Sequence, residues 1–189
     1  MKKIHYNSPV ILTYFLVSFA SLILGYITNN ATTNAFFSVY KAPLTDVLTY
    51  VRFFGHVIGH ANFSHFINNM LLLLVIGPAM EEKYGSGTLL LGIAVTAVIS
   101  GLLQFFFFPN SALLGASGIV FMMIMLSSLS GMKEGYIPLT LIFVGVLYIG
   151  QELYSMFFVS DNVANFMHIV GGACGTGFGF LVGRNRSVY

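Results

Sequence analysis

Six apolar stretches separated by short polar connections constrain what this chain can fold into. A membrane-crossing helix needs about 20 apolar residues, and the stretches lie near residues 9–27, 60–80, 86–107, 117–131, 136–158 and 163–183. Charged residues make up only 7% of the chain, whereas a soluble domain carries about 25%. We therefore expect an all-α membrane protein, with one integral membrane domain over residues 1–189 built as a six-transmembrane-helix bundle.

The basic residues predict the orientation of this bundle. If the N-terminus lies inside, six of them fall at the inner face and only Lys41 and Arg52 fall outside. The inner six are Lys2, Lys3, Lys83, Lys133, Arg184 and Arg186. Positive charge accumulates on the cytoplasmic side of membrane proteins, so both termini are expected inside. The net charge of +2 then reflects topology, and no basic stripe predicts a nucleic-acid partner.

Three polar residues are expected at the same depth in the membrane. His65, Ser117 and His168 each lie sixteen residues before the first charged residue at the inner end of their stretch. At 1.5 Å per residue this spacing is about 24 Å, within a hydrocarbon core of about 30 Å. All three residues are thus predicted several ångströms below the outer surface. Polar groups at that depth are costly and mark candidate functional sites.

The local sequence indicates how a serine and a histidine could meet. Pro109 and Gly115 interrupt the chain before Ser117, so a short helix is expected to begin at Ser117. Small residues follow His168 on one helix face, namely Gly171, Gly172, Gly175 and Gly179. Such a stripe lets another helix approach closely. A serine beside a histidine is the arrangement of an activated nucleophile, which predicts hydrolysis inside the membrane.

Structural explanations exist for each of these features. Small residues around a serine are common in membrane helices, glycine stripes usually serve packing, and a lone histidine is more often structural. A metal site is another alternative, with His56, His60 and His65 as ligands. No His-Glu-x-x-His motif accompanies them, however, and a metal site leaves Ser117 and His168 unexplained. The coincidence of depth, helix start and glycine stripe favours the serine–histidine pair.

The segment from Arg52 to Met70 (RFFGHVIGHANFSHFINNM) completes a pattern of three histidines followed by Asn69. Together with Gly115-Ala116-Ser117-Gly118 and with His168, it resembles the rhomboid family of intramembrane serine proteases, in the bacterial-type six-helix form. The resemblance implies a serine–histidine dyad without an acidic third member, no metal and no cofactor. It also implies a transmembrane protein as substrate, cleaved near the outer membrane face, and a location in the bacterial cytoplasmic membrane.

Roles follow from the resemblance position by position. Ser117 is the expected nucleophile and His168 the general base. His65, Asn69 and the backbone N–H of Ser117 correspond to the oxyanion hole. His65 and Asn69 also share one helix face by their spacing, and both side chains can donate hydrogen bonds. The residues expected to shape the site are Gly115, Ala116, Gly118, Phe121, Gly171, Gly175, Arg52, His56 and His60.

The chain departs from the family pattern at three positions. Val51 stands where the family has tryptophan before the arginine, Phe121 replaces the usual tyrosine, and Met167 replaces the alanine before the base. None of these changes removes a catalytic group, so an active protease is expected. The alternatives are a catalytically inactive rhomboid-like binding or chaperone protein and, less favoured, a histidine-metal hydrolase or transporter. The pattern assigns no role to the intramembrane acid Glu152 and predicts no oligomeric state.

Overall fold

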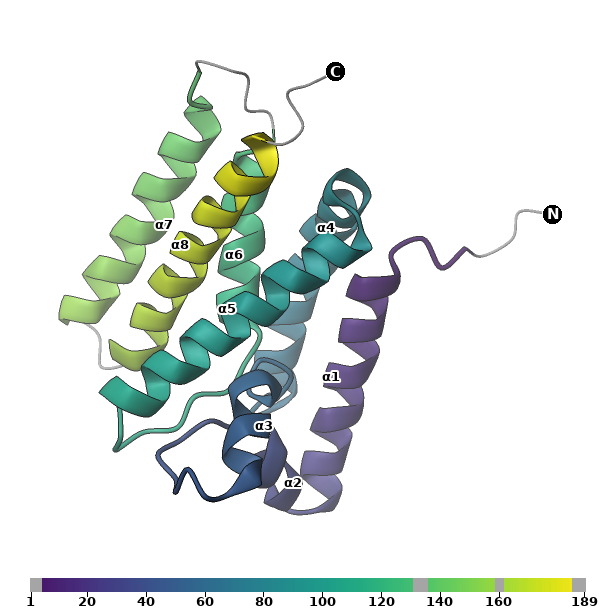
Figure 1. The fold of residues 1–189 in the computed structure, drawn as a ribbon, viewed down its shortest axis with the longest axis vertical. Coiled ribbons are helices and arrows are strands. Elements are labelled where there is room, and N and C mark those ends of the chain that lie inside the picture. Colours follow the sequence, from purple (N-terminus) through teal and green to yellow (C-terminus); the bar gives the residue numbers. More distant parts are fainter. Residues whose placement is uncertain (1–4, 131–135, 159–161, 185–189) are drawn as a thin grey trace.

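The computed structural model describes residues 5–130, 136–158 and 162–184, and this part of the chain is almost entirely helical. Its elements are α1 (Pro9–Ile27), α2 (Ala31–Phe36), α3 (Val47–Gly55), α4 (Phe63–Tyr84), α5 (Ser86–Phe107), α6 (Ser117–Ser128), α7 (Leu139–Phe158) and α8 (Asn162–Arg184). Figure 1 shows the beginning of α1 and the end of α8 toward the same end of the bundle, with α2 and α3 at the opposite end. The expected all-α membrane fold is confirmed.

Four helices are long and apolar enough to cross a membrane among the described residues: α1, α4, α5 and α8. The count of six spans therefore stays a prediction. Helix α6 has 12 residues, which corresponds to about 18 Å and is too short for a hydrocarbon core of about 30 Å. The irregular chain before α6 must then reach into the membrane, which is tolerated where protein surrounds it.

Helix α6 forms the centre of the bundle, and its closest neighbour is α8 (Figure 1). A Cβ atom added at Gly171 would overlap the backbone oxygen of Gly118, and one added at Gly175 would overlap that of Met122. The two backbones therefore touch along this stripe, which only small residues permit. Most of α6 is buried as a result. This close packing also fixes the position of Ser117 along the bundle axis relative to that of His168 on α8.

Glu81, near the C-terminal end of α4, fastens α1 to the rest of the bundle. Its carboxylate accepts hydrogen bonds from Ser8 Oγ at 2.6 Å, from the backbone N–H of Val10 at 2.9 Å and from that of Ile11 at 3.1 Å. Ser86 Oγ, at the start of α5, donates to the same carboxylate at 2.7 Å. The first N–H groups of a helix lack partners within the helix, so this buried acid caps α1 from another helix.

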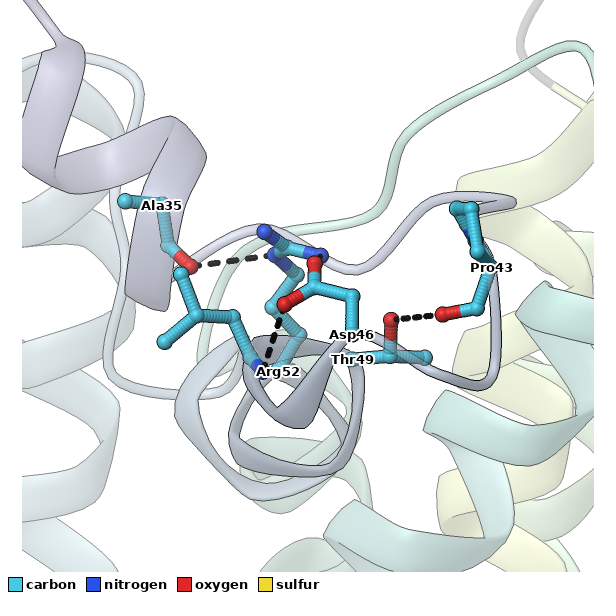
Figure 2. Close-up of polar contacts among 6 residues, drawn as sticks. Ala35, Pro43, Asp46, Thr49 and Arg52 are labelled. Atoms are coloured by element: carbon cyan, nitrogen blue, oxygen red, sulfur yellow. Dashed lines mark hydrogen bonds and ion pairs between the residues drawn. The ribbon is translucent and has the colours of Figure 1, made fainter.

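The segment between α1 and α4 is organised by Arg52, as Figure 2 shows. Arg52 Nε donates to the Ala35 carbonyl at 3.0 Å, and Nη1 donates to Asp46 Oδ2 at 3.1 Å. The guanidinium also lies over the Tyr40 ring, 4.6 Å from its centroid. Asp46 in turn caps α3 by accepting from Leu48 N. Arg52 therefore joins three parts of this segment, and its role in shaping the site stays a prediction.

Helices α2 and α3 are not predicted by the apolar pattern, and the predicted start of the next helix, near residue 60, is too early. Asn62 caps α4 by accepting from the backbone N–H of His65, so α4 begins at Phe63 rather than at residue 60. His60 consequently lies in the loop before the helix. Both differences arise from capping and short turns, which leave little trace in an apolar pattern.

Candidate active site

The loop before α6 is held so that Ser117 opens the helix. Gly115 has φ of 129°, a backbone conformation that favours glycine. Its N–H donates to the carbonyl of His56 at 2.9 Å. Further back, Leu113 and Val39 form an antiparallel bridge with two hydrogen bonds of 2.9 Å. No side-chain hydrogen bond caps the start of α6, so its N-terminal N–H groups favour negative charge beside Ser117.

His65 and Asn69 face the same loop from α4. A Cβ atom built on Gly115 would lie 2.8 Å from His65 Nε2 and 3.9 Å from Asn69 Nδ2. The absence of a side chain at Gly115 therefore lets both groups reach the backbone just before Ser117. Asn69 is buried, and its Nδ2 has no hydrogen-bond partner among the described residues. Buried donors are nearly always paired, so this amide is an unusual group that could serve a transient oxyanion.

His168 lies against α6 one turn beyond Ser117. Its ring stacks on Phe121, with centroids 4.5 Å apart and planes 7° from parallel. Since Phe121 follows Ser117 by four residues, the two share one face of α6. The buried Met167 also approaches this helix, because its carbonyl oxygen lies 3.7 Å from a Cβ built on Gly118. These contacts gather His65, Asn69 and His168 around the first turns of α6.

His56 and His60 support the loop rather than lining the space beside Ser117. His56 is 1% exposed; its Nδ1 donates to the Arg52 carbonyl at 3.1 Å, and its Nε2 lies 3.2 Å from Ser100 Oγ. His60 Nδ1 donates to the Ile58 carbonyl at 3.1 Å. Burial lowers the pKa of His56 and that of His60 to about 4. Both rings are therefore neutral structural groups at physiological pH.

Ser100 and His56 form a second serine–histidine contact, but its surroundings differ from those of a nucleophile. Both side chains are buried, and Ser100 Oγ also lies 2.8 Å from the Thr96 carbonyl oxygen. A Cβ on Gly101 would come within 3.3 Å of the His56 ring, so the pair is tightly enclosed. A substrate carbonyl has no room there. The contact joins the His56 loop to α5.

Among the described residues, no three His, Cys, Asp or Glu side chains lie close enough together to hold a metal ion. This part of the chain therefore offers no ligand set for the metal alternative. His60 does approach His65, with ring centroids 5.2 Å apart in an edge-to-face arrangement. His56, however, has protein partners at both ring nitrogens. The three histidines thus do not converge on one point.

Sequence reasoning missed the polar residues of α5 that support the site. Gln104 Nε2 donates to the carbonyls of Phe108 at 3.2 Å and of Ser111 at 3.0 Å. These bonds fasten the beginning of the loop that leads to Ser117. A signal was present, because Thr96, Ser100 and Gln104 recur every four residues within an apolar stretch. All three are buried, on the helix face that this spacing predicts.

The fold and these contacts define an integral membrane protein with a serine, two histidines and an asparagine gathered near one end of a short central helix. A comparison with protein families agrees with this description, because the model of the Rhomboid domain matches residues 48–185. The chain therefore belongs to the rhomboid family. Members of this family act as intramembrane serine proteases on transmembrane protein substrates, and the family also includes inactive members.

Proposed function

We propose that this chain is an active intramembrane serine endopeptidase that cleaves transmembrane segments of membrane proteins near the outer membrane face. The observation that carries the proposal is the stacking of His168 on Phe121 at 4.5 Å, one turn along α6 from Ser117. Phe121 and Ser117 share one face of α6, so a base stacked on Phe121 is proposed to reach the serine. Ser117 and His168 then act as a dyad without a third, acidic member.

The proposed chemistry follows from the two groups. Ser117 Oγ attacks the carbonyl carbon of the scissile peptide bond while the His168 imidazole accepts the hydroxyl proton. The imidazolium next gives this proton to the leaving amine, and an acyl-enzyme on Ser117 remains. Water, activated by the neutral His168, then hydrolyses the ester and restores the serine. No metal or cofactor takes part in these steps.

The oxyanion of each tetrahedral intermediate is proposed to bind between α4 and α6. Asn69 Nδ2, a ring N–H of His65 and the backbone N–H of Ser117 are the donors. The support comes from the approach of His65 and Asn69 to Gly115 and from the absence of a described partner for Asn69 Nδ2. Such a donor contributes about 2.7–4 kcal/mol to transition-state stabilisation.

The bundle is proposed to lie in the bacterial cytoplasmic membrane with both termini inside. Four apolar helices support an integral membrane location, and the excess of basic residues at the predicted inner face supports the orientation. Ser117 at the start of α6 then lies toward the outer face. The substrate is a transmembrane segment of another membrane protein, which reaches the site from the lipid.

An inactive, rhomboid-like binding protein is the second candidate. Phe121 favours it, because phenylalanine lacks the hydroxyl that could orient the base. Met167 also favours it, because a long, buried side chain (2% exposed) stands directly before the base. Covalent labelling with a fluorophosphonate in lipid separates the two functions. Active protein is labelled, and Ser117→Ala abolishes the label.

Ser100→Ala is the matched control, because it removes the serine of the enclosed contact with His56. Its labelling should persist. Loss of the label in Ser100→Ala with retention in Ser117→Ala would refute the assigned nucleophile. An unlabelled wild-type protein that still binds a transmembrane peptide would support the inactive alternative. Inhibition of cleavage by a chelator would support the metal-dependent one.

A further inference from the structure

A cavity of about 410 Å³ lies between α1 and α5, away from Ser117 and His168. We call it the α1–α5 groove; its apolar walls are Pro9, Val10, Val17, Ile58 and Leu90. Val17 is 43% exposed and Leu90 is 55% exposed, so the groove opens on the outside of the bundle. The first turns of α1 and α5, which form its walls, lie close together in Figure 1.

The few polar groups of the groove already have partners within the protein. Thr13 Oγ1 shares a hydrogen bond of 3.0 Å with the Tyr6 hydroxyl. The Tyr14 hydroxyl donates to the Val57 carbonyl at 2.6 Å, and Ser86 Oγ donates to Glu81. An ordered water needs two to four polar partners, and apolar cavities stay dry. The groove therefore suits an apolar occupant.

The membrane around the protein determines which apolar molecule can occupy the α1–α5 groove. Both α1 and α5 are candidate membrane spans, so the mouth of the groove faces hydrocarbon rather than water. We propose that the α1–α5 groove binds one acyl chain of a membrane phospholipid. Pro9 and Ser86 stand at the beginnings of their helices, which the predicted orientation places at the inner face. The lipid then belongs to the inner leaflet.

An acyl chain in this groove contacts the loop that supports the candidate oxyanion hole. Ile58 forms part of the groove wall, and its carbonyl accepts the hydrogen bond from His60 Nδ1. The His60 ring in turn lies against His65. The bound chain thus fills the space behind the loop and limits its movement. Occupancy of the groove is expected to stabilise the arrangement of His60 and His65.

Single-tryptophan fluorescence tests the binding directly, because the natural chain contains no tryptophan. Val17→Trp places the reporter at the mouth of the groove. Leu16→Trp is the matched control, since Leu16 is the adjacent residue, is 55% exposed and is not part of the groove wall. Each variant, purified in detergent, is titrated with a phosphatidylcholine that carries brominated acyl chains. We expect saturable quenching of Val17→Trp at a single lipid per protein and only gradual quenching of Leu16→Trp.

Filling the groove should remove the saturable phase. Val10→Phe and, separately, Leu90→Phe are introduced into the Val17→Trp protein, so that one folded variant suffices for the comparison. Identical quenching of the two tryptophan reporters, or a saturable phase that survives both filling substitutions, would overturn the proposal. Saturable quenching that occurs only after deletion of residues 2–4 would also overturn it, because the N-terminal segment would then be the occupant. The readout is binding, so it does not depend on protease activity.

Discussion

Asn69→Ala separates a catalytic role of this residue from a structural one. A structural asparagine at a buried position forms hydrogen bonds, and its loss destabilises the fold. Asn69 Nδ2 is instead buried without a partner among the described residues. An unsatisfied buried donor costs about 1–3 kcal/mol, so its removal should leave the unfolding free energy nearly unchanged or slightly higher.

The expected loss is in turnover. If Asn69 donates to the oxyanion, Asn69→Ala removes about 2.7–4 kcal/mol of transition-state stabilisation, which is a decrease of about 10²–10³-fold in kcat. The Michaelis constant should change little, because the oxyanion exists only along the reaction path. His65 lies close to the same backbone and could compensate in part, so the lower value is expected.

The assay measures kcat and KM with a transmembrane substrate in liposomes and the thermal unfolding of the same variants in detergent. Asn68→Ala is the matched control, because it changes the same residue type at the exposed neighbouring position of α4; it should retain wild-type kcat. Asn69→Leu should be as inactive as Asn69→Ala without loss of stability. An increase in KM alone, or a large loss of stability in both Asn69 variants, would refute the oxyanion role.

Three further predictions concern the base, the loop and the topology. His168→Ala should lower kcat on the order of 10⁴-fold or more, because a nucleophile and its base act as a unit; cleavage near the wild-type rate in liposomes would contradict the dyad. Burial lowers the pKa of His56 from 6.5 to about 4, so between these two pH values the unfolded chain binds a proton that the folded protein does not. The free energy of unfolding therefore falls as the pH drops from 6.5 toward 4. The loss is about 3 kcal/mol, measurable as a fall in Tm, and His56→Asn should show a flatter dependence; an equal slope would exclude this source. On a Cys174→Ser background, a cysteine at exposed Asn110 should react with an impermeant thiol reagent from outside intact cells, whereas one at exposed Gly87 should not; the reverse labelling would overturn the orientation.

Several elements could be predicted because the information is local. An apolar stretch of membrane length is a property of consecutive residues, and α1 and α5 appear at the bounds expected for them, 9–27 and 86–107. The start of α6 at Ser117 follows from the proline and glycine before it. The family resemblance likewise rests on the histidines, the serine motif and their order along the chain, and the Rhomboid domain match confirms it.

The short helices between α1 and α4 could not be predicted in the same way. Their stability depends on the contacts of Arg52 with Asp46 in the preceding turn and with Ala35, which lies in another helix seventeen residues away. An arginine in an apolar surrounding predicts a partner, but it does not say which residue supplies it. Short helices are marginal without tertiary contacts, so their position is decided only when the loop folds against the bundle.

The sequence by itself determined the class of protein, the candidate nucleophile and base, and the residues expected near the oxyanion. Hydropathy, helix-breaking residues and motif order are properties of the sequence itself. They can be recognised without any knowledge of how the helices pack. The tertiary structure decided which of the polar residues gather around α6 and which support the loops. His56 and His65 occur in one motif, yet His56 is enclosed beside Ser100, whereas His65 reaches the backbone at Gly115. Burial and hydrogen bonding across the bundle separate these two histidines, because the environment of a side chain depends on residues that the chain brings together only when it folds.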